Sequence, residues 1–272
     1  MDNSIKDIIR KRRSVRTFDE RPLSVEDKEK LTGYLKECDN PFGVSVEFRF
    51  LDAKEHELTS PVIVGADSYI GIKMKNEPLY EVACGYSFEK MCLYALSLGI
   101  GTVILAGTFN RKAFEKAMTL KDDEVMPVAS PLGYPAEHKS VRETVMRKAI
   151  KADERLPYEK LFFANSFSNA IKKEQAGVFA DALEAVRLAP SAVNKQPWRA
   201  VVCGDAVHFF EKHAKSLTGD SMDVQKIDIG IALAHFDLTM QENGIHGTFT
   251  TFNPDVELDN LTEYIISYQI NR

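Results

Sequence analysis

Three polar residues near the start of the chain are spaced so that they could bind an anion. Arg12, Ser14 and Arg16 lie two apart in RKRRSVRTF (10–18). This alternation predicts an extended segment with the three side chains on one face. Two guanidinium groups and a hydroxyl can hold a phosphate through charge-assisted hydrogen bonds. The same residues also fit a solvated basic patch, or cations that compensate the end of a helix.

A second candidate site is a turn rich in proline and amide side chains. It reads APSAVNKQPW (189–198) and follows a strongly amphipathic stretch. Its two prolines fix the direction of the backbone around a hydroxyl and two amides, which both donate and accept hydrogen bonds. Such a turn suits a planar heterocycle with alternating carbonyls and ring nitrogens. A rigid connection with Trp198 as a core anchor is the alternative interpretation.

The elements that must position these residues can be outlined from periodicity. A short helix over 5–9 precedes the basic segment, and Ser24 is the expected N-cap of a helix to about Cys38. The segment 86–98 is apolar nearly all round, which predicts a helix covered on most sides. The other expected elements are strands at 44–51, 67–74, 103–106, 125–129, 198–203 and 263–270, helices at 176–188 and 229–241, and a polar, basic stretch from 137 to about 175.

The two halves of the chain share features that suggest an internal duplication. Gly85 precedes Gly99 by the same interval as Gly230 precedes Gly244, and each pair is expected to bracket an apolar helix. LGIGTVILAGTFN (98–110) and NGIHGTFTTFN (243–253) then follow with similar residues. The halves predicted are 1–150 and 151–272, closely entwined in an α+β fold. Convergent α+β patterns are the alternative.

Composition narrows the class of protein. The 272 residues carry a formal net charge of −5, which disfavours nucleic acid or an anionic membrane as the main partner. Four cysteines without a C-x-x-C pair indicate a reducing compartment, so a cytoplasmic location is expected. The sequence shows neither a membrane span nor a secretory signal, and its histidines show no metal-ligand spacing, so no metal is predicted.

The chain resembles the FMN-dependent nitroreductases, in particular their tandem, single-chain branch. The resemblance is carried by RKRRSVRTF (10–18), APSAVNKQPWRAVV (189–202) and PLGYPAE (131–137). In the ordinary family, one repeat carries both the first two motifs, and two subunits build two FMN sites. Here the motifs are separated by almost the whole chain. The resemblance therefore implies a nitroreductase-like pseudo-dimer in which one chain holds one complete site, so that a monomer suffices.

The resemblance also implies roles for individual residues. The phosphate of FMN would be held by the first motif and by basic residues after G-Y-P-x-E. Lys139 and Arg142 are the candidates among these basic residues, and Arg147 fits nearly as well. The flavin ring would be held by the turn, and its N5 would receive a backbone N–H, best placed at Gly107. The residues implied in cofactor binding are Arg12, Arg13, Ser14, Arg16, Leu105, Ala106, Gly107, Lys139, Arg142, Pro190, Ser191, Ala192, Asn194 and Gln196.

The activity implied is an FMN-dependent NAD(P)H oxidoreductase with ping-pong turnover. NADH or NADPH would deliver hydride to flavin N5, and a small acceptor such as a nitroaromatic or quinone would then be reduced, with no catalytic side chain required. Two alternatives remain: a flavin-binding storage or sensor protein with little turnover, and a scaffold or nucleic-acid module that uses Arg10 to Arg16.

Overall fold

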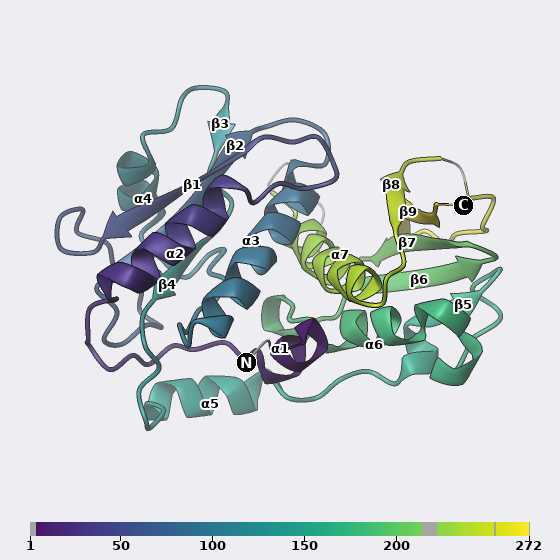
Figure 1. Ribbon diagram of the computed structural model, residues 1–272, viewed down its shortest axis with the longest axis horizontal. Coiled ribbons are helices and arrows are strands. Elements are labelled where there is room, and N and C mark those ends of the chain that lie inside the picture. The colour runs from purple at the N-terminus through teal and green to yellow at the C-terminus, as the bar shows by residue number, and fades with distance from the viewer. Residues whose placement is uncertain (1–3, 214–221, 253, 272) are drawn as a thin grey trace. The chain divides into compact units, whose positions relative to one another are not determined.

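The computed structural model describes residues 4–213, 222–252 and 254–271. The chain forms two compact units, coloured mainly purple to teal and green to yellow in Figure 1. Lys11–Ala152 is called the first unit, and Met1–Arg10 with Asp153–Arg272 the second unit. Both are sheets flanked by helices, which confirms the α+β fold class. The expected halves 1–150 and 151–272 stay a prediction, since the units place the first ten residues with the second half of the chain.

The first unit is built on an antiparallel sheet. Its strands follow the order β1–β2–β3, and β4 also pairs with β2. The helices of this unit are α2 (Val25–Lys36), α3 (Tyr80–Ser97), α4 (Arg111–Met118) and α5 (Val141–Ala149), and its strands are β1 (Val46–Asp52), β2 (Ser68–Lys75), β3 (Glu124–Val125) and β4 (Ala129–Leu132).

Strand β2 is covered on both faces, which explains why its segment YIGIKM is apolar on both faces apart from Lys73, whose Nζ pairs with Glu124 Oε2 at 2.9 Å. On one face, Phe48 pairs across the sheet with Ile72, and its ring lies 6.0 Å from that of Phe88 on α3. On the other face, the ring of Tyr69 meets Phe114 of α4 edge-on at 5.1 Å. The sheet of the first unit is therefore a central layer between α3 and α4.

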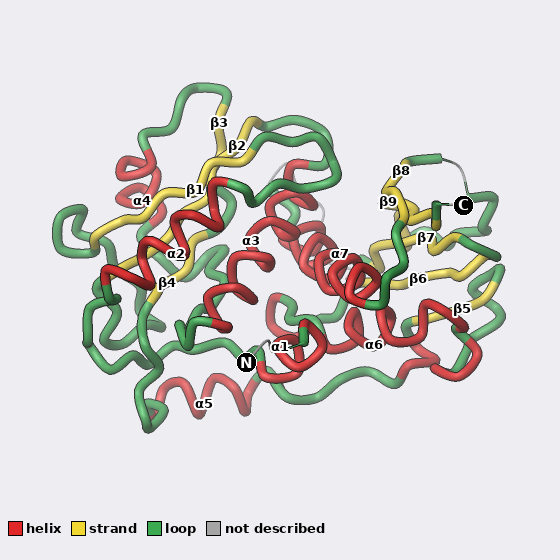
Figure 2. Tube along the Cα trace, in the orientation of Figure 1, coloured by secondary structure: helices red, strands yellow, loops and turns green. Residues whose placement is uncertain are grey.

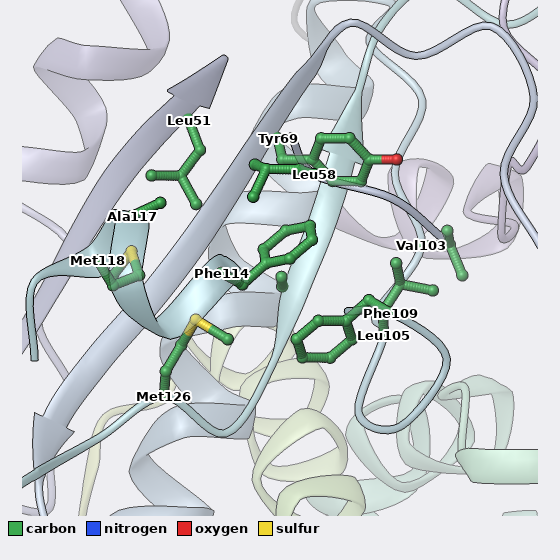
Figure 3. Packing of buried hydrophobic residues seen from close by; sticks show 11 residues of the cluster. Leu51, Leu58, Tyr69, Val103, Leu105, Phe109, Phe114, Ala117, Met118 and Met126 are labelled. Atoms are coloured by element: carbon green, nitrogen blue, oxygen red, sulfur yellow. The ribbon is translucent and has the colours of Figure 1, made fainter. Parts of the chain in front are cut away.

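A hydrophobic cluster fills the space between the sheet and α4. Phe114 is fully buried and lies in the middle of the cluster, with Tyr69 on one side and Phe109 on the other (Figure 3). The centroids of the Phe109 and Phe114 rings are 4.8 Å apart. The cluster also contains Leu51, Leu58, Val103, Leu105, Ala117, Met118, Met126 and Ala129.

The second unit has a sheet with the order β5–β6–β7–β9–β8, in which only β5 and β6 run parallel. Helices α6 and α7 pack together in this unit and are drawn in red in Figure 2. Its helices are α1 (Ile5–Lys11), which runs one residue into the first unit, α6 (Ala180–Leu188) and α7 (Val224–Glu242), and its strands are β5 (Phe162–Ala164), β6 (Trp198–Cys203), β7 (Ala206–Lys212), β8 (Gly247–Thr250) and β9 (Thr262–Ile270).

Strand β7 is buried on both faces, like β2 in the first unit. Phe209 faces α7, where its ring lies 5.0 Å from Phe236. Phe210 faces the opposite side and meets Phe167 at 5.0 Å and Tyr264 at 5.7 Å. The N-terminal helix α1 joins this unit through Lys6 Nζ, which donates to Asn243 Oδ1 at 2.9 Å.

The two units share an order of elements. In the first unit, α2 precedes β1, and α3 lies in the chain between β2 and β4; the sheet contains the path β1–β2–β4. In the second unit, α6 precedes β6, and α7 lies between β7 and β9; the sheet contains the path β6–β7–β9. Both paths are antiparallel. This shared order supports the predicted duplication without testing its origin.

The two long apolar helices end in the same way. After α3, Gly99 has φ +79°, and Ile100 N donates to Ala95 O at 2.9 Å. After α7, Gly244 has φ +73°, and Ile245 N donates to Met240 O at 3.0 Å. Both are Schellman endings, in which glycine takes the left-handed conformation at no steric cost. The expectation that glycine pairs bracket these helices was wrong, because Gly85 and Gly230 lie inside them.

Local signals placed some elements well and others poorly. Ser24 caps α2 as predicted, and its Oγ accepts from Asp27 N at 3.0 Å. The strand expected at 103–106 was wrong, since Leu105 forms only an isolated bridge with Ala129. The strand expected at 125–129 is split into β3 and β4 around Pro127, which has no N–H to donate.

Several elements of the structure were not predicted from the sequence, or begin at other residues than predicted. Helix α5 lies in the stretch described from the sequence only as polar and basic, for which no helix was predicted; Ser140 caps it by accepting from Glu143 N at 3.1 Å. Strands β5 and β7 were also missed. The helix expected over 176–188 begins as a 3₁₀ turn, Gly177–Phe179, before α6. None of the described helices combines the length and the apolar character needed to cross a membrane.

Candidate functional site

The basic segment at the start of the first unit is extended, as expected, and its backbone is fixed on both sides. Val15 N donates to Thr102 O at 2.9 Å. Arg16 O accepts from Val64 N at 2.9 Å, and Thr17 O accepts from Ala136 N at 3.0 Å. These bonds hold the segment as an isolated strand-like bridge between distant loops, so the side chains of Arg12 to Arg16 project from a rigid backbone.

Two glycines allow the basic segment to pack closely against the neighbouring loops. A Cβ on Gly101 would come within 2.8 Å of Val15 Cγ1, and a Cβ on Gly133 would come within 2.9 Å of Phe18 Cδ1. Val15 and Phe18 are both buried, so neither side chain can move aside freely. Gly101 and Gly133 therefore form the floor on which the basic segment rests, which gives the Gly of the G-Y-P-x-E motif a steric reason.

Arg16 lies at the centre of a cluster of positive charge. Burial and the charges of Arg147 and Arg12 lower its pKa, while Glu143 opposes this change. Among the described residues, the buried Nε of Arg16 has no hydrogen-bond acceptor. A half-buried guanidinium that keeps an unused buried donor beside other arginines is the environment expected of an anion site, since the anion would supply both the acceptor and the countercharge.

Glu143 on α5 organises the segment from the other side. Its side chain is 2% exposed, and Oε2 accepts from Arg16 N at 3.2 Å and from Thr17 Oγ1 at 2.8 Å. Arg13 Nη1 lies 4.0 Å from its Oε1. Glu143 belongs to no predicted binding position. The S-x-x-E spacing of Ser140 and Glu143, together with the basic last turn of Arg147 and Lys148, is a sequence signal that could have found the helix that carries it.

Arg12 is held by a buried carboxylate on α3. Its Nε lies 3.7 Å from Glu89 Oε1, and both side chains are buried. A cavity of about 90 Å³ in the first unit is lined by Arg12 and Arg13 together with Lys11 and the Gly101 backbone. Four guanidinium groups (Arg12, Arg13, Arg16 and Arg147) and two carboxylates (Glu89 and Glu143) thus lie around this segment, which leaves an excess of positive charge.

The structure separates the three basic residues predicted after the G-Y-P-x-E motif. Arg147 acts electrostatically on Arg16, as described above. Arg142 Nη1 donates to the carbonyl oxygen of Pro61. Lys139 is exposed. Of the three, Arg147 is therefore the residue whose charge acts on the positive cluster around Arg16.

The loop predicted to meet flavin N5 lies at the edge of the hydrophobic cluster. Leu105 is buried and exchanges two backbone hydrogen bonds with Ala129, of 2.8 and 3.0 Å. Ala106 O accepts from Arg111 Nη2 at 2.5 Å. Gly107 is exposed, and a Cβ there would have nothing within 4 Å. The role of the Gly107 N–H stays a prediction.

The proline-rich turn lies in the second unit and is conformationally strained. Val193, Asn194 and Gln196 have φ values of 44°, 57° and 52°. Left-handed backbone is especially unfavourable for a β-branched residue such as Val193. Strain of this kind costs on the order of 1–3 kcal/mol per residue and is typical of ligand-binding segments.

The polar side chains of the turn hold its shape. Ser191 Oγ accepts from Gln196 N at 2.8 Å. Asn194 Nδ2 donates to Glu154 O at 3.0 Å, and Gln196 Oε1 accepts from Leu156 N at 2.9 Å. Pro190 and Ala192 are half-buried. The residues predicted to contact the ring are thus brought together in one turn, and their contact with a flavin stays a prediction.

Asp228 on α7 anchors this turn and was not predicted. Both of its carboxylate oxygens lie 3.0 Å from Ala192 N, and its side chain is almost completely buried. Burial raises its pKa well above the ordinary value, and the charges of Glu211 and Asp223 add to the effect. Sequence reasoning had no signal for this contact, because the two residues lie 36 positions apart.

Asp228→Ala is expected to lower the free energy of unfolding by about 1–3 kcal/mol, because Ala192 N–H loses its acceptor. Asp228→Asn, which keeps an acceptor oxygen, should cost less. The raised pKa means that the folded chain keeps a proton which the unfolded chain releases near pH 3.8, so this contribution to stability falls as the pH rises. Urea denaturation at several pH values measures both effects. A pH dependence that Asn does not flatten would contradict the assignment.

Comparisons with known proteins agree with this architecture. A family model described as "Putative TM nitroreductase" matches residues 4–240. A crystal structure of a "putative nitroreductase" from Thermotoga maritima MSB8 is similar over 100% of this chain and 96% of its own, with a TM-score of 0.67 and 20% sequence identity. The chain belongs to this nitroreductase family.

Shorter matches cover about half of the chain. An FMN-dependent nitroreductase from Clostridium difficile R20291 covers 49% of this chain and 88% of its own, with 17% identity and a TM-score of 0.42. A "Putative NADH dehydrogenase/NAD(P)H nitroreductase" from Bacteroides thetaiotaomicron covers 52% and 91%, with 19% identity and a TM-score of 0.43. No curated protein matches the chain. The family is defined by the family model, and the full-length likeness shows the fold.

Proposed function

We propose that the protein is an FMN-dependent NAD(P)H oxidoreductase of the nitroreductase type, which reduces a small acceptor such as a nitroaromatic or a quinone. The observation that carries the proposal is the environment of Arg16. Its buried Nε has no acceptor among the described residues, and Arg12 and Arg147 add positive charge beside it. The phosphate of FMN is a dianion at neutral pH and would supply the acceptors that this cluster needs.

The residues divide the work of binding. Arg12, Arg13, Arg16 and Arg147 would hold the phosphate, with Ser14 as a further donor. The turn from Pro190 to Gln196 offers backbone and amide groups for the flavin ring. FMN, when bound, supplies hydride transfer between a nicotinamide and the acceptor. The side chains then need only bind and orient the cofactor and its substrates, so the proposal assigns no catalytic side chain.

Glu143 and Asp228 are positioning residues in this proposal. Glu143 fixes the backbone at Arg16 in the first unit, and Asp228 fixes the backbone at Ala192 in the second. Each is a buried carboxylate that accepts from a backbone N–H, so each sets the direction of a neighbouring binding segment. Neither is expected to exchange protons with a substrate.

Purified protein is expected to be yellow and to bind about one FMN per chain, as the single set of motifs predicts. Anaerobic NADH or NADPH should bleach its absorbance near 450 nm, and a quinone should restore it. Flavin absorbance after denaturation gives the stoichiometry. Two FMN per chain would contradict the single site. Protein that binds FMN and is not bleached would support a storage or sensor role, and colourless protein that gains no FMN on titration would contradict flavin binding.

A further inference from the structure

A second cluster of ligand-type side chains lies in the second unit, outside the residues predicted to bind FMN. Glu211 is in β7, His213 follows the end of that strand, and Asp223 precedes α7. One ligand atom from each lies within 4.8 Å of the others. Glu211 lies two residues after Phe209, so both side chains are on the face of β7 that is toward α7, and the side chain of Glu211 is fully buried.

The buried carboxylate of Glu211 is incompletely satisfied. Its Oε1 lies 2.9 Å from His213 Nδ1 and accepts from Gln225 Nε2 at 3.3 Å. Its Oε2 is also buried and has no hydrogen-bond partner among the described residues. A buried carboxylate is costly unless it is paired, hydrogen-bonded or bound to a metal ion. The unused oxygen therefore points to a missing cation within this cluster.

The surroundings of His213 support a metal ion. Its Nε2 lies 3.1 Å from Glu263 Oε2, and Lys226 Nζ lies 3.0 Å from the other oxygen of Glu263. Glu263 pairs directly with Glu211 across β7 and β9. A histidine that binds a metal commonly donates its second ring N–H to a carboxylate, which orients the ring. Glu263 is in the position to do this, and it leaves Nδ1 facing Glu211.

We propose that Glu211, His213 and Asp223 bind a divalent transition-metal ion, with Zn²⁺ as the best match. Imidazole nitrogen and carboxylate oxygen are both ligands of Zn²⁺, three protein ligands leave one position of a tetrahedral site open, and water would complete the coordination. The ion would join the end of β7 to the start of α7. Asp223 already caps α7 by accepting from Gln225 N at 2.9 Å, so one carboxylate would serve both the helix and the metal.

The test uses the whole, tag-free chain as purified, with whatever flavin it carries, because a histidine tag would bind the probe. The protein is treated with a chelator, exchanged into a non-coordinating buffer and titrated with Zn²⁺ by calorimetry. Bound zinc is counted by elemental analysis after desalting. About one Zn²⁺ per chain is expected, together with a higher thermal midpoint. Failure to bind one equivalent would overturn the proposal, independently of any flavin activity.

Variants separate this site from adventitious binding. His213→Gln should weaken Zn²⁺ binding at least tenfold, and Glu263→Gln should weaken it about tenfold through loss of ring orientation. His56→Gln is the matched control, because His56 Nε2 lies 3.8 Å from the single carboxylate of Glu55. It should keep native affinity. Binding that survives His213→Gln would overturn the proposal, and a native far-UV spectrum of each variant excludes misfolding as the cause of a loss.

Discussion

Arg16→Ala is expected to weaken FMN binding by about 10- to 100-fold. The substitution removes a half-buried guanidinium whose Nε has no acceptor among the described residues. A hydrogen bond to a charged group contributes about 1.5–3 kcal/mol, which corresponds to this range of dissociation constants. The backbone N–H and C=O of residue 16 remain, so the bonds to Glu143 and Val64 can persist. Fluorescence titration of apoprotein with FMN measures the loss.

The control for this prediction is another arginine of the first unit. Arg21 pairs with Asp19 on the surface, and Arg21→Ala should leave FMN affinity unchanged. Arg16→Lys should fall between Ala and the native residue, because lysine keeps the charge and loses the planar set of donors. Undiminished affinity of Arg16→Ala, with native affinity in the control, would remove Arg16 from the phosphate site.

Phe114→Ala is expected to lower the free energy of unfolding by about 3–5 kcal/mol. Phe114 is fully buried in the cluster of Figure 3, and its ring contacts Tyr69 and Phe109 edge-on. Truncation removes both aromatic contacts and leaves a cavity between α4 and β2 that close-packed neighbours fill only in part. Urea denaturation followed by far-UV circular dichroism measures the change.

Val145→Ala provides the comparison within the same unit. Val145 lies on α5, and 62% of it is exposed. Its truncation should change the free energy of unfolding by no more than about 0.5 kcal/mol. Equal losses for Phe114→Ala and Val145→Ala would show that the cluster around Phe114 does not carry the stability assigned to it.

The sequence was most informative where a structural choice is made within a few residues. Ser24 caps a helix because its hydroxyl reaches an N–H three positions ahead. Gly99 and Gly244 end helices because the left-handed conformation is open to glycine. The motif residues could also be identified from the sequence, because R-x-S-x-R and the proline-rich turn each consist of residues that are close together in the chain.

Errors arose where an element depends on a distant partner. Strand β5 is three residues long and owes its place to parallel pairing with β6. Segment 103–106 has the composition of a strand, yet only Leu105 finds a β-type partner there, in Ala129. A short apolar sequence is compatible with either a strand or a loop, and the hydrogen-bond partners available in the fold decide which of the two it forms.

By itself the sequence determined the family, the α+β class and the identity of the phosphate-binding candidates, because these follow from residue type and short-range spacing. The tertiary structure alone decided which carboxylates lie beside these candidates, beside the proline-rich turn and beside His213. Glu143 accepts a hydrogen bond from Arg16 N, 127 positions away in the chain, and Asp228 accepts one from Ala192 N, 36 positions away. Glu211 and His213, at the end of β7, lie close to Asp223, which precedes α7. Such contacts depend on how separate elements pack, and packing brings together residues that no local pattern connects.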